Sequence, residues 1–77
     1  MKTIEKPAKI MRRGKFNKDL IYHRRVELGL SIEAVAKRLK MWKSNVAAWE
    51  EGRYVPTAPT IAKLAKALEV QPPYFFD

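Results

Sequence analysis

The fold of this chain is decided by residues 31–56, which read SIEAVAKRLKMWKSNVAAWEEGRYVP. Ser31 is a favourable helix N-cap residue, and Glu33 places a negative charge in the first turn, where it suits the helix dipole. Apolar side chains then recur three and four residues apart on one face, namely Val35, Ala36 and Leu39. This pattern predicts a short helix over about residues 32–39.

A second short helix follows after a break of a few residues. Val46 and Trp49 lie three residues apart, as the buried side chains of one helical face do. Gly52 supplies the left-handed residue that commonly ends a helix, so this helix is predicted over about residues 43–51. Two short helices joined by a tight turn form the unit called helix-turn-helix. Small all-α proteins often contain two adjacent short helices, so periodicity alone does not establish DNA binding.

The flanking residues predict further helices around this unit. Asn17 can cap a first helix that Gly29 ends, and Thr57 can cap another helix after the unit. That later helix has a core stripe of apolar residues at helical spacing, which are Ile61, Leu64, Ala65 and Leu68. The run Gln-Pro-Pro at residues 71–73 stops it. Residues 74–76 then close the chain as one short helical turn.

The 77 residues have room for one domain. We expect residues 17–77 to form an all-α, compact bundle of about five short helices. Residues 1–16 contain Pro7 and Gly14 and lack a sustained apolar stripe, so they are predicted to be a flexible basic N-terminal arm. The apolar residues of this arm, Ile4, Ile10, Met11 and Phe16, are too many for a purely solvating tail. Some of them are expected to pack on the domain or on a partner chain.

The net charge of +8 is concentrated in the leading segment. Residues 1–18 carry seven basic side chains and one acidic one, whereas residues 19–77 carry nine basic and seven acidic side chains. The leading segment is therefore at +6 and the rest at +2. Such a segment suits a polyanion, most often nucleic acid, although a solvated tail kept for solubility has the same composition. The composition leaves both interpretations open.

Several function classes lack their sequence signals. The chain has no cysteine, no apolar run near the length of a membrane span and no signal peptide. His23 is the only histidine, and no partner is spaced to make it a general base or a metal ligand. We therefore expect no enzyme activity, no metal and no cofactor. We expect a cytoplasmic, nucleoid-associated location.

A specific set of motifs narrows the function. Gly29-Leu30-Ser31 is followed at fixed distances by residues 43–46, Lys-Ser-Asn-Val, and by Trp49-Glu50-x-Gly52. Residues 64–70 and the Tyr74-Phe75 pair continue the pattern. Over roughly residues 17–77, the chain resembles the Cro/XRE-type, phage-repressor-like helix-turn-helix family. The resemblance implies five short helices, of which the third lies in the DNA major groove.

The resemblance also implies roles for individual residues. Arg25 on the first helix would pair with Glu50 on the third and tie the two helices together. The positions implied to approach base edges are Lys43, Ser44, Ala47 and Ala48. The other candidates for DNA contact are Lys40 and Arg53, which flank the third helix and would bind phosphates, Asn45, which could reach a phosphate or a base, and Trp42. From the arm, Arg12, Arg13 and Lys15 would add phosphate contacts. Val46 and Trp49 are expected in the core.

Three positions depart from the family's pattern, and all are on the DNA-facing side. Ile32 replaces a common glutamine, and Lys40 replaces a common glycine, so the turn is expected to differ in shape. Trp42 replaces a small capping residue. Its side chain would then lie along the DNA backbone, or the third helix would start later with Ser44 as its cap.

Two functions therefore stand after the sequence alone. The first is a sequence-specific transcriptional regulator, bacterial or phage in character and typically a repressor, that binds double-stranded DNA as a homodimer. The second is a protein-interaction module on the same fold, of the adaptor or antitoxin kind, with weak nonspecific DNA binding. Its interface would use Ile32, Trp42 and the apolar residues of the arm.

Overall fold

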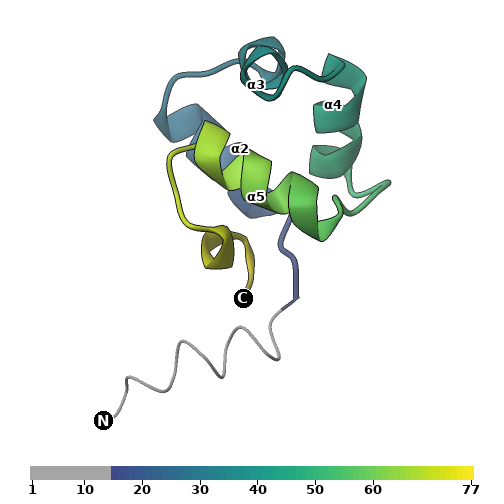
Figure 1. Ribbon diagram of the computed structural model, residues 1–77, viewed down its shortest axis with the longest axis vertical. Helices are drawn as coiled ribbons and strands as arrows, with labels where there is room; N and C mark the ends of the chain where they lie inside the picture. The colour runs from purple at the N-terminus through teal and green to yellow at the C-terminus, as the bar shows by residue number, and fades with distance from the viewer. Residues whose placement is uncertain (1–14) are drawn as a thin grey trace, which may run out of the picture.

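The computed structural model describes residues 15–77. Four α-helices pack into a compact all-helical domain in which α3 and α4 form the helix-turn-helix unit and α5 packs against α3 (Figure 1). Their bounds are α2 Asp19–Glu27, α3 Ile32–Leu39, α4 Lys43–Glu51 and α5 Ala58–Ala67, followed by the 3-10 turn η2 Pro72–Phe75. The described residues thus contain four α-helices and one 3-10 turn, so five α-helices are not confirmed.

The core lies where the inward faces of all these elements meet. Its largest fully buried side chains are Ile21, Val35, Val46, Leu64, Leu68 and Phe75. Trp49, only 6% exposed, joins the same cluster from α4. Because burying a side chain of this size contributes about 1.5–3 kcal/mol, this cluster holds the helix-turn-helix unit on α2 and α5. Val46 and Trp49 therefore lie in the core, where the sequence predicts them.

Local sequence signals fix the helix ends near the unit. Ser31 Oγ accepts the Ala34 N–H at 3.0 Å, which makes Ser31 the expected N-cap of α3. Gly29 (φ 70°) and Gly52 (φ 82°) both adopt the left-handed conformation, which costs a glycine little. Thr57 holds the N-cap position of α5, but its hydroxyl donates to Thr60 Oγ1 at 3.0 Å instead of accepting a backbone N–H.

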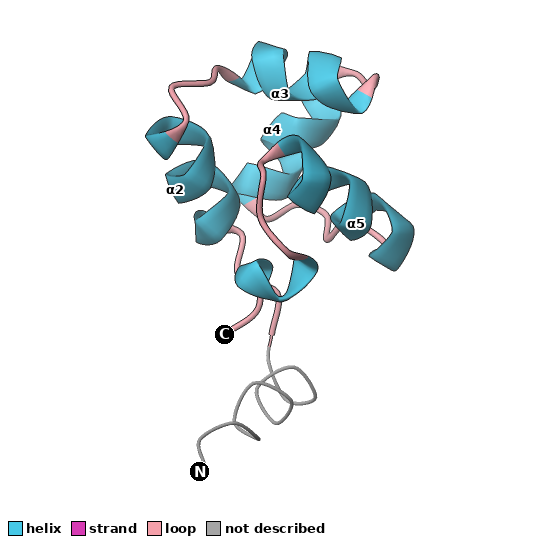
Figure 2. Ribbon diagram, turned by 60° about the vertical axis from the view of Figure 1, so that its left-hand side comes forward, coloured by secondary structure: helices cyan, strands magenta, loops and turns pink. Residues whose placement is uncertain are grey.

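The chain ends of the described domain pair with each other. Phe16 forms an antiparallel bridge with Phe76, and the Asn17 N–H donates to the Phe75 carbonyl at 2.7 Å. The Asp77 N–H donates to the Lys15 carbonyl at 3.0 Å. Figures 1 and 2 place the C-terminus beside the segment that leads into α2. Lys15 and Phe16 thus pack with the domain, and residues 1–14 of the predicted arm lie outside the described residues.

The first helix begins slightly later than a helix capped by Asn17 would. Asn17 Oδ1 accepts the Asp19 N–H at 2.9 Å, so its side chain does cap the first turn. Lys18 nevertheless holds the N-cap position of α2, and it makes no side-chain capping bond.

The turn between α3 and α4 keeps the shape that glycine usually gives it. Lys40 is the C-cap of α3 with φ 60° and ψ 44°, a left-handed conformation. The Met41 N–H donates to the Ala36 carbonyl at 3.0 Å, which closes the turn. The expectation that Lys40 would change the turn's shape is therefore wrong. The lysine adopts the strained conformation because core packing on both sides holds the two helices in place.

This strain leads to a prediction about stability. Replacing Lys40 with glycine is expected to raise the free energy of unfolding by about 0.5–1 kcal/mol. Glycine removes the steric cost of a side chain in the left-handed conformation, but its greater conformational entropy in the unfolded chain offsets part of the gain. Urea unfolding of the two proteins measures the change. The matched control is Lys37→Gly inside α3, which should lower the free energy of unfolding by about 1 kcal/mol. A loss of stability in Lys40→Gly would show that the turn is not strained.

Candidate nucleic-acid interface

An ion pair ties α4 to α2. Arg25 Nε lies 2.7 Å from Glu50 Oε2, and Arg25 Nη2 lies 3.0 Å from Glu50 Oε1, a bidentate geometry. Arg25 Nη1 also donates to the Leu30 carbonyl at 3.0 Å. The two side chains are only 12% and 10% exposed. The pair that the resemblance implies is therefore present and nearly closed to solvent.

The surroundings of Arg25 hold it in its charged form. The hydrogen bond to Glu50 raises the pKa of Arg25, although burial opposes the shift, and the charge of Glu50 adds to the rise. The Tyr22 ring also lies against the guanidinium, with its centroid 5.3 Å from Cζ. A permanently charged Arg25 keeps Glu50 paired, and this fixes the C-terminal half of α4 against α2.

With its inner face fixed, α4 presents an outward stripe to solvent. Lys43 and Ser44 are exposed, and Ala47 is partly exposed one turn further on. Asn45 is partly buried beside them. These are the residue types that contact base edges or phosphates when a helix enters the major groove.

Ala48 corrects the expected set of DNA contacts. Its side chain is 4% exposed, so it is not part of the outward stripe. Gly52 reverses the chain, and the Arg53 N–H returns to the Ala48 carbonyl at 2.9 Å. The inner face of α4 is therefore wider in its last turns than the spacing of Val46 and Trp49 suggests.

Trp42 occupies the N-cap position of α4 and is 80% exposed. The helix starts at Lys43, so the alternative of a later start capped by Ser44 is wrong. Trp42 makes no side-chain capping bond. The first N–H groups of α4 thus have no capping side chain, and among them the Asn45 N–H donates to the Trp42 carbonyl at 3.0 Å. Hollows of about 430 and 290 Å³ adjoin this tryptophan.

Charge is distributed unevenly over the described residues. Each arginine among residues 15–77 forms an ion pair. The pairs are Arg24–Glu27, Arg25–Glu50, Arg38–Glu69 and Arg53–Glu51. Within the same residues, Lys15, Lys37, Lys40, Lys43, Lys63 and Lys66 form none. All of these lysines except Lys15 line the hollows around Met41 and Trp42. Most of the unpaired lysines are therefore gathered around the start of α4.

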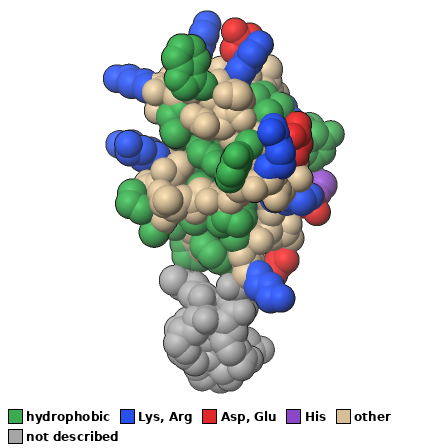
Figure 3. All heavy atoms as spheres, turned by 90° about the vertical axis from the view of Figure 1, so that its right-hand side faces the viewer, with side chains coloured by type: hydrophobic (Ala, Val, Ile, Leu, Met, Phe, Trp, Pro, Cys, Tyr) green, Lys and Arg blue, Asp and Glu red, His purple; other side chains and the backbone are tan. Residues whose placement is uncertain are grey.

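Figure 3 views the molecule from the side of α4. Lys and Arg side chains stand around the edges of this face, at the left without acidic neighbours and at the top, right and bottom beside acidic side chains, and hydrophobic side chains are exposed between them. The exposed apolar residues in the part of the chain described include Trp42, Tyr54 and Val55. A basic surface with exposed aromatics is typical of a nucleic-acid interface.

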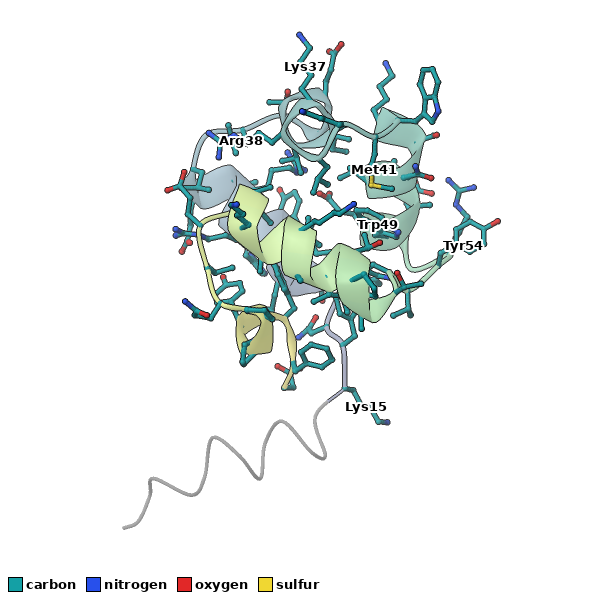
Figure 4. All side chains as sticks on the ribbon, viewed as in Figure 1. Lys15, Lys37, Arg38, Met41, Trp49 and Tyr54 are labelled. Atoms are coloured by element: carbon teal, nitrogen blue, oxygen red, sulfur yellow. The ribbon has the colours of Figure 1, made fainter. Side chains whose placement is uncertain are left out.

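The structure adds Lys37 to the sequence-predicted set and separates Lys15 from it. Lys37 shares a hollow with Trp42 and Lys43, although it lies on α3. Its exposed position three residues before Lys40 is a weak sequence signal, because exposed lysines are common on helices. Figure 4 shows Lys15 at the opposite end of the molecule from Lys37. Arg12 and Arg13 lie outside the described residues.

Arg53 is less available for phosphate than its position suggests. Its Nε donates to Glu51 Oε1 at 2.9 Å, and both side chains are about 60% exposed. Such an exposed pair contributes little to stability, so a phosphate can displace Glu51. Tyr54 follows directly in the same loop and is 66% exposed.

Other sites were sought among residues 15–77. No group of three histidine, cysteine, aspartate or glutamate side chains there is placed to hold a metal ion. None of the helices among these residues has the length and apolar character needed to cross a membrane.

Comparison with known proteins gives one match. A family profile described as helix-turn-helix matches residues 21–75, which spans α3, α4 and α5 and most of α2. Curated proteins and solved structures give no significant match. Since the match covers most of the chain, the protein belongs to the Cro/C1-type helix-turn-helix family, a family of DNA-binding regulators and not of enzymes.

Proposed function

We propose that this protein is a sequence-specific transcriptional regulator that inserts α4 into the major groove of duplex DNA. The observation that carries the proposal is the outward stripe of Lys43, Ser44 and Ala47, none of which is buried in the core. Lys43 can donate to guanine O6 or N7, and Ser44 can donate or accept. The Ala47 methyl group can contact a thymine methyl. Asn45 has the reach for a base or a phosphate.

Phosphate contacts would fix the register of α4 in the groove. Lys37 lies in the last turn of α3 and Lys40 caps its C-terminus, and neither forms an ion pair among the described residues. Arg53 lies beyond the far end of α4. The uncapped N–H groups at the start of α4 favour an anion as well. These contacts position the domain on DNA but carry no sequence information.

A homodimer best supplies the specificity that such a regulator needs. The direct readout in one copy comes from a few short side chains of α4, and a single module of this size buries little DNA surface. Two copies related by a two-fold axis would read two half-sites about 34–36 Å apart on one face of the duplex. We therefore expect a palindromic operator.

Selection of binding sites from random duplex DNA tests this proposal. We expect enrichment of an inverted repeat whose half-sites are one helical turn apart. Enrichment of a single half-site would contradict the homodimer, and the absence of any enriched sequence would contradict sequence-specific binding. The random DNA pool before selection gives the nonspecific background against which enrichment is measured.

The N-terminal arm is proposed to strengthen binding to all sequences equally. Deletion of Met1 to Gly14 removes Lys2, Lys6, Lys9, Arg12 and Arg13. We expect weaker binding to every duplex and a smaller salt dependence, because each lost phosphate contact reduces the slope by about 0.9. Titrations at several salt concentrations measure this. An unchanged slope would assign the arm to solubility or to a protein partner.

Trp42 favours a second candidate function, a protein-interaction module. A tryptophan that is 80% exposed and adjoined by two hollows is a suitable anchor for a partner protein. Ile32 contributes less than expected from the sequence, because it is partly buried against the core. On this reading, Trp42→Ala would lose a co-purifying protein while retaining DNA binding. Loss of DNA binding in Trp42→Ala would instead support contact between the ring and the duplex.

A further inference from the structure

A basic groove lies between the end of α3 and the outer side of α5. Its volume is about 520 Å³, and it also reaches the turn that leads into α4. The lining includes the apolar side chains of Leu39, Met41 and Ala67, together with the ammonium groups of Lys40, Lys63 and Lys66. Leu39 is buried, Met41 and Ala67 are partly buried, and the three lysines are exposed. The groove therefore combines an apolar floor with a positive rim, and we call it the α3–α5 groove.

Within the described residues, no carboxylate neutralises this rim. Glu69, which lies just beyond α5, is paired with Arg38 Nη1 at 3.2 Å. The same Arg38 nitrogen donates to the Ala67 carbonyl at 2.7 Å, so both groups are held at the edge of the groove. Lys63 and Lys66 are three residues apart on α5, where like charges repel weakly. An external anion would remove that repulsion.

The groove lies apart from the surface that is proposed to read DNA. Figure 4 shows Met41 directed from the turn toward α5, whereas Lys37 points away from the domain. The outward stripe of Lys43, Ser44 and Ala47 belongs to α4, and none of these residues lines the groove. Lys40 is shared by this groove and by the hollow beside Trp42. Contact of α4 with a duplex therefore leaves the α5 side of the groove without a role.

We propose that the α3–α5 groove binds an acidic peptide segment of a partner protein. Carboxylates of the segment would pair with Lys63, Lys66 and Lys40, and one medium-sized apolar side chain would cover Met41 and Ala67. The apolar floor favours a peptide over DNA, because a sugar-phosphate backbone has no side chain to fill it. The positive rim selects a negatively charged peptide, and the apolar floor selects an apolar side chain within that peptide. This inference extends beyond the DNA-binding function and does not depend on it.

A synthetic peptide tests the proposal on the full chain. The probe carries a central leucine flanked on each side by two glutamates, and its binding is followed by shifts of backbone amide NMR signals. We expect shifts at Met41, Thr60, Lys63, Lys66 and Ala67. The double variant Lys63→Glu/Lys66→Glu should weaken binding at least about tenfold, because two pairs are lost and replaced by repulsion.

Two controls keep the result specific. The variant Lys15→Glu/Lys18→Glu makes the same change in net charge away from the groove and should leave peptide binding nearly unchanged. A peptide with serine in place of leucine should bind several-fold more weakly if the floor is used. Circular dichroism checks that each variant folds, which is expected because all four lysines are exposed.

Three results would overturn the proposal. Equal weakening by both double variants would show a response to net charge alone. Equal binding of the leucine and serine peptides would show that the apolar floor is not used. A DNA salt slope reduced by nearly two units in Lys63→Glu/Lys66→Glu would assign the groove to phosphates, since each contact contributes about 0.9.

Discussion

Replacing Glu50 with glutamine, or Arg25 with methionine, is expected to lower the free energy of unfolding by about 3–5 kcal/mol. Each change leaves one charged side chain that is about nine-tenths buried without its partner. Arg25→Met also removes the hydrogen bond to the Leu30 carbonyl, in the segment between α2 and α3. Urea unfolding followed by circular dichroism measures both variants.

The double variant shows whether the two side chains interact. Its loss of stability should be smaller than the sum of the single losses, because neither charge is then left alone in the interior. The exposed pair between Glu51 and Arg53 is a matched control, and its removal should cost less than about 1 kcal/mol. Strictly additive losses at Arg25 and Glu50 would contradict the structure's central tie between α2 and α4.

Replacing Ala47 with glutamate is expected to abolish specific DNA binding while the domain stays folded. Ala47 is partly exposed in the middle of the outward stripe, so a longer side chain can be accommodated toward solvent. In a complex, its carboxylate would face the polyanionic duplex, and such like-charge contacts cost several kcal/mol. The expected loss of affinity is therefore at least about a hundredfold. Titration on the selected operator measures it.

The control for Ala47→Glu is Ala62→Glu on α5. Ala62 is exposed. Its replacement by glutamate makes the same change in composition and charge away from the stripe. It should reduce affinity only slightly, and circular dichroism should show native helix content in both variants. If both glutamates weaken binding equally, the loss reflects net charge, and the place of α4 in the groove is contradicted.

Much of the helix-turn-helix unit is predictable because its signals are local. Ser31 caps α3 through a bond three residues away, and Gly52 ends α4 within its own turn. The apolar spacing of Val46 and Trp49 then identifies the inner face of α4. Each of these features depends on a few consecutive residues, so the sequence contains all that is needed.

Other features depend on contacts that sequence patterns do not record. Phe16 pairs with Phe76, which lies at the other end of the domain's sequence, and no local sequence signal predicts this contact. Ala48 is buried because the chain returns beside it after Gly52. The gathering of Lys37 and Lys63 around one turn follows from how α3 packs on α5. Whether an exposed lysine stays unpaired also depends on this packing.

Trp42 combines both situations. The sequence left open whether the helix starts at Lys43 or later with Ser44 as its cap, and the structure has it start at Lys43. Core positions around the turn are already filled by Leu39 and Val46, both buried, so the ring remains in solvent.

The most direct test of α4 as the reading helix is the binding free energy of Lys43→Ala on two duplexes, the selected operator and a random sequence, at one salt concentration. We expect a loss of about 1–3 kcal/mol on the operator and little loss on the random duplex, because a base contact discriminates and a phosphate contact does not. Equal losses on both duplexes would make Lys43 a phosphate ligand. No loss on either would remove the start of α4 from the interface and contradict sequence reading by this helix.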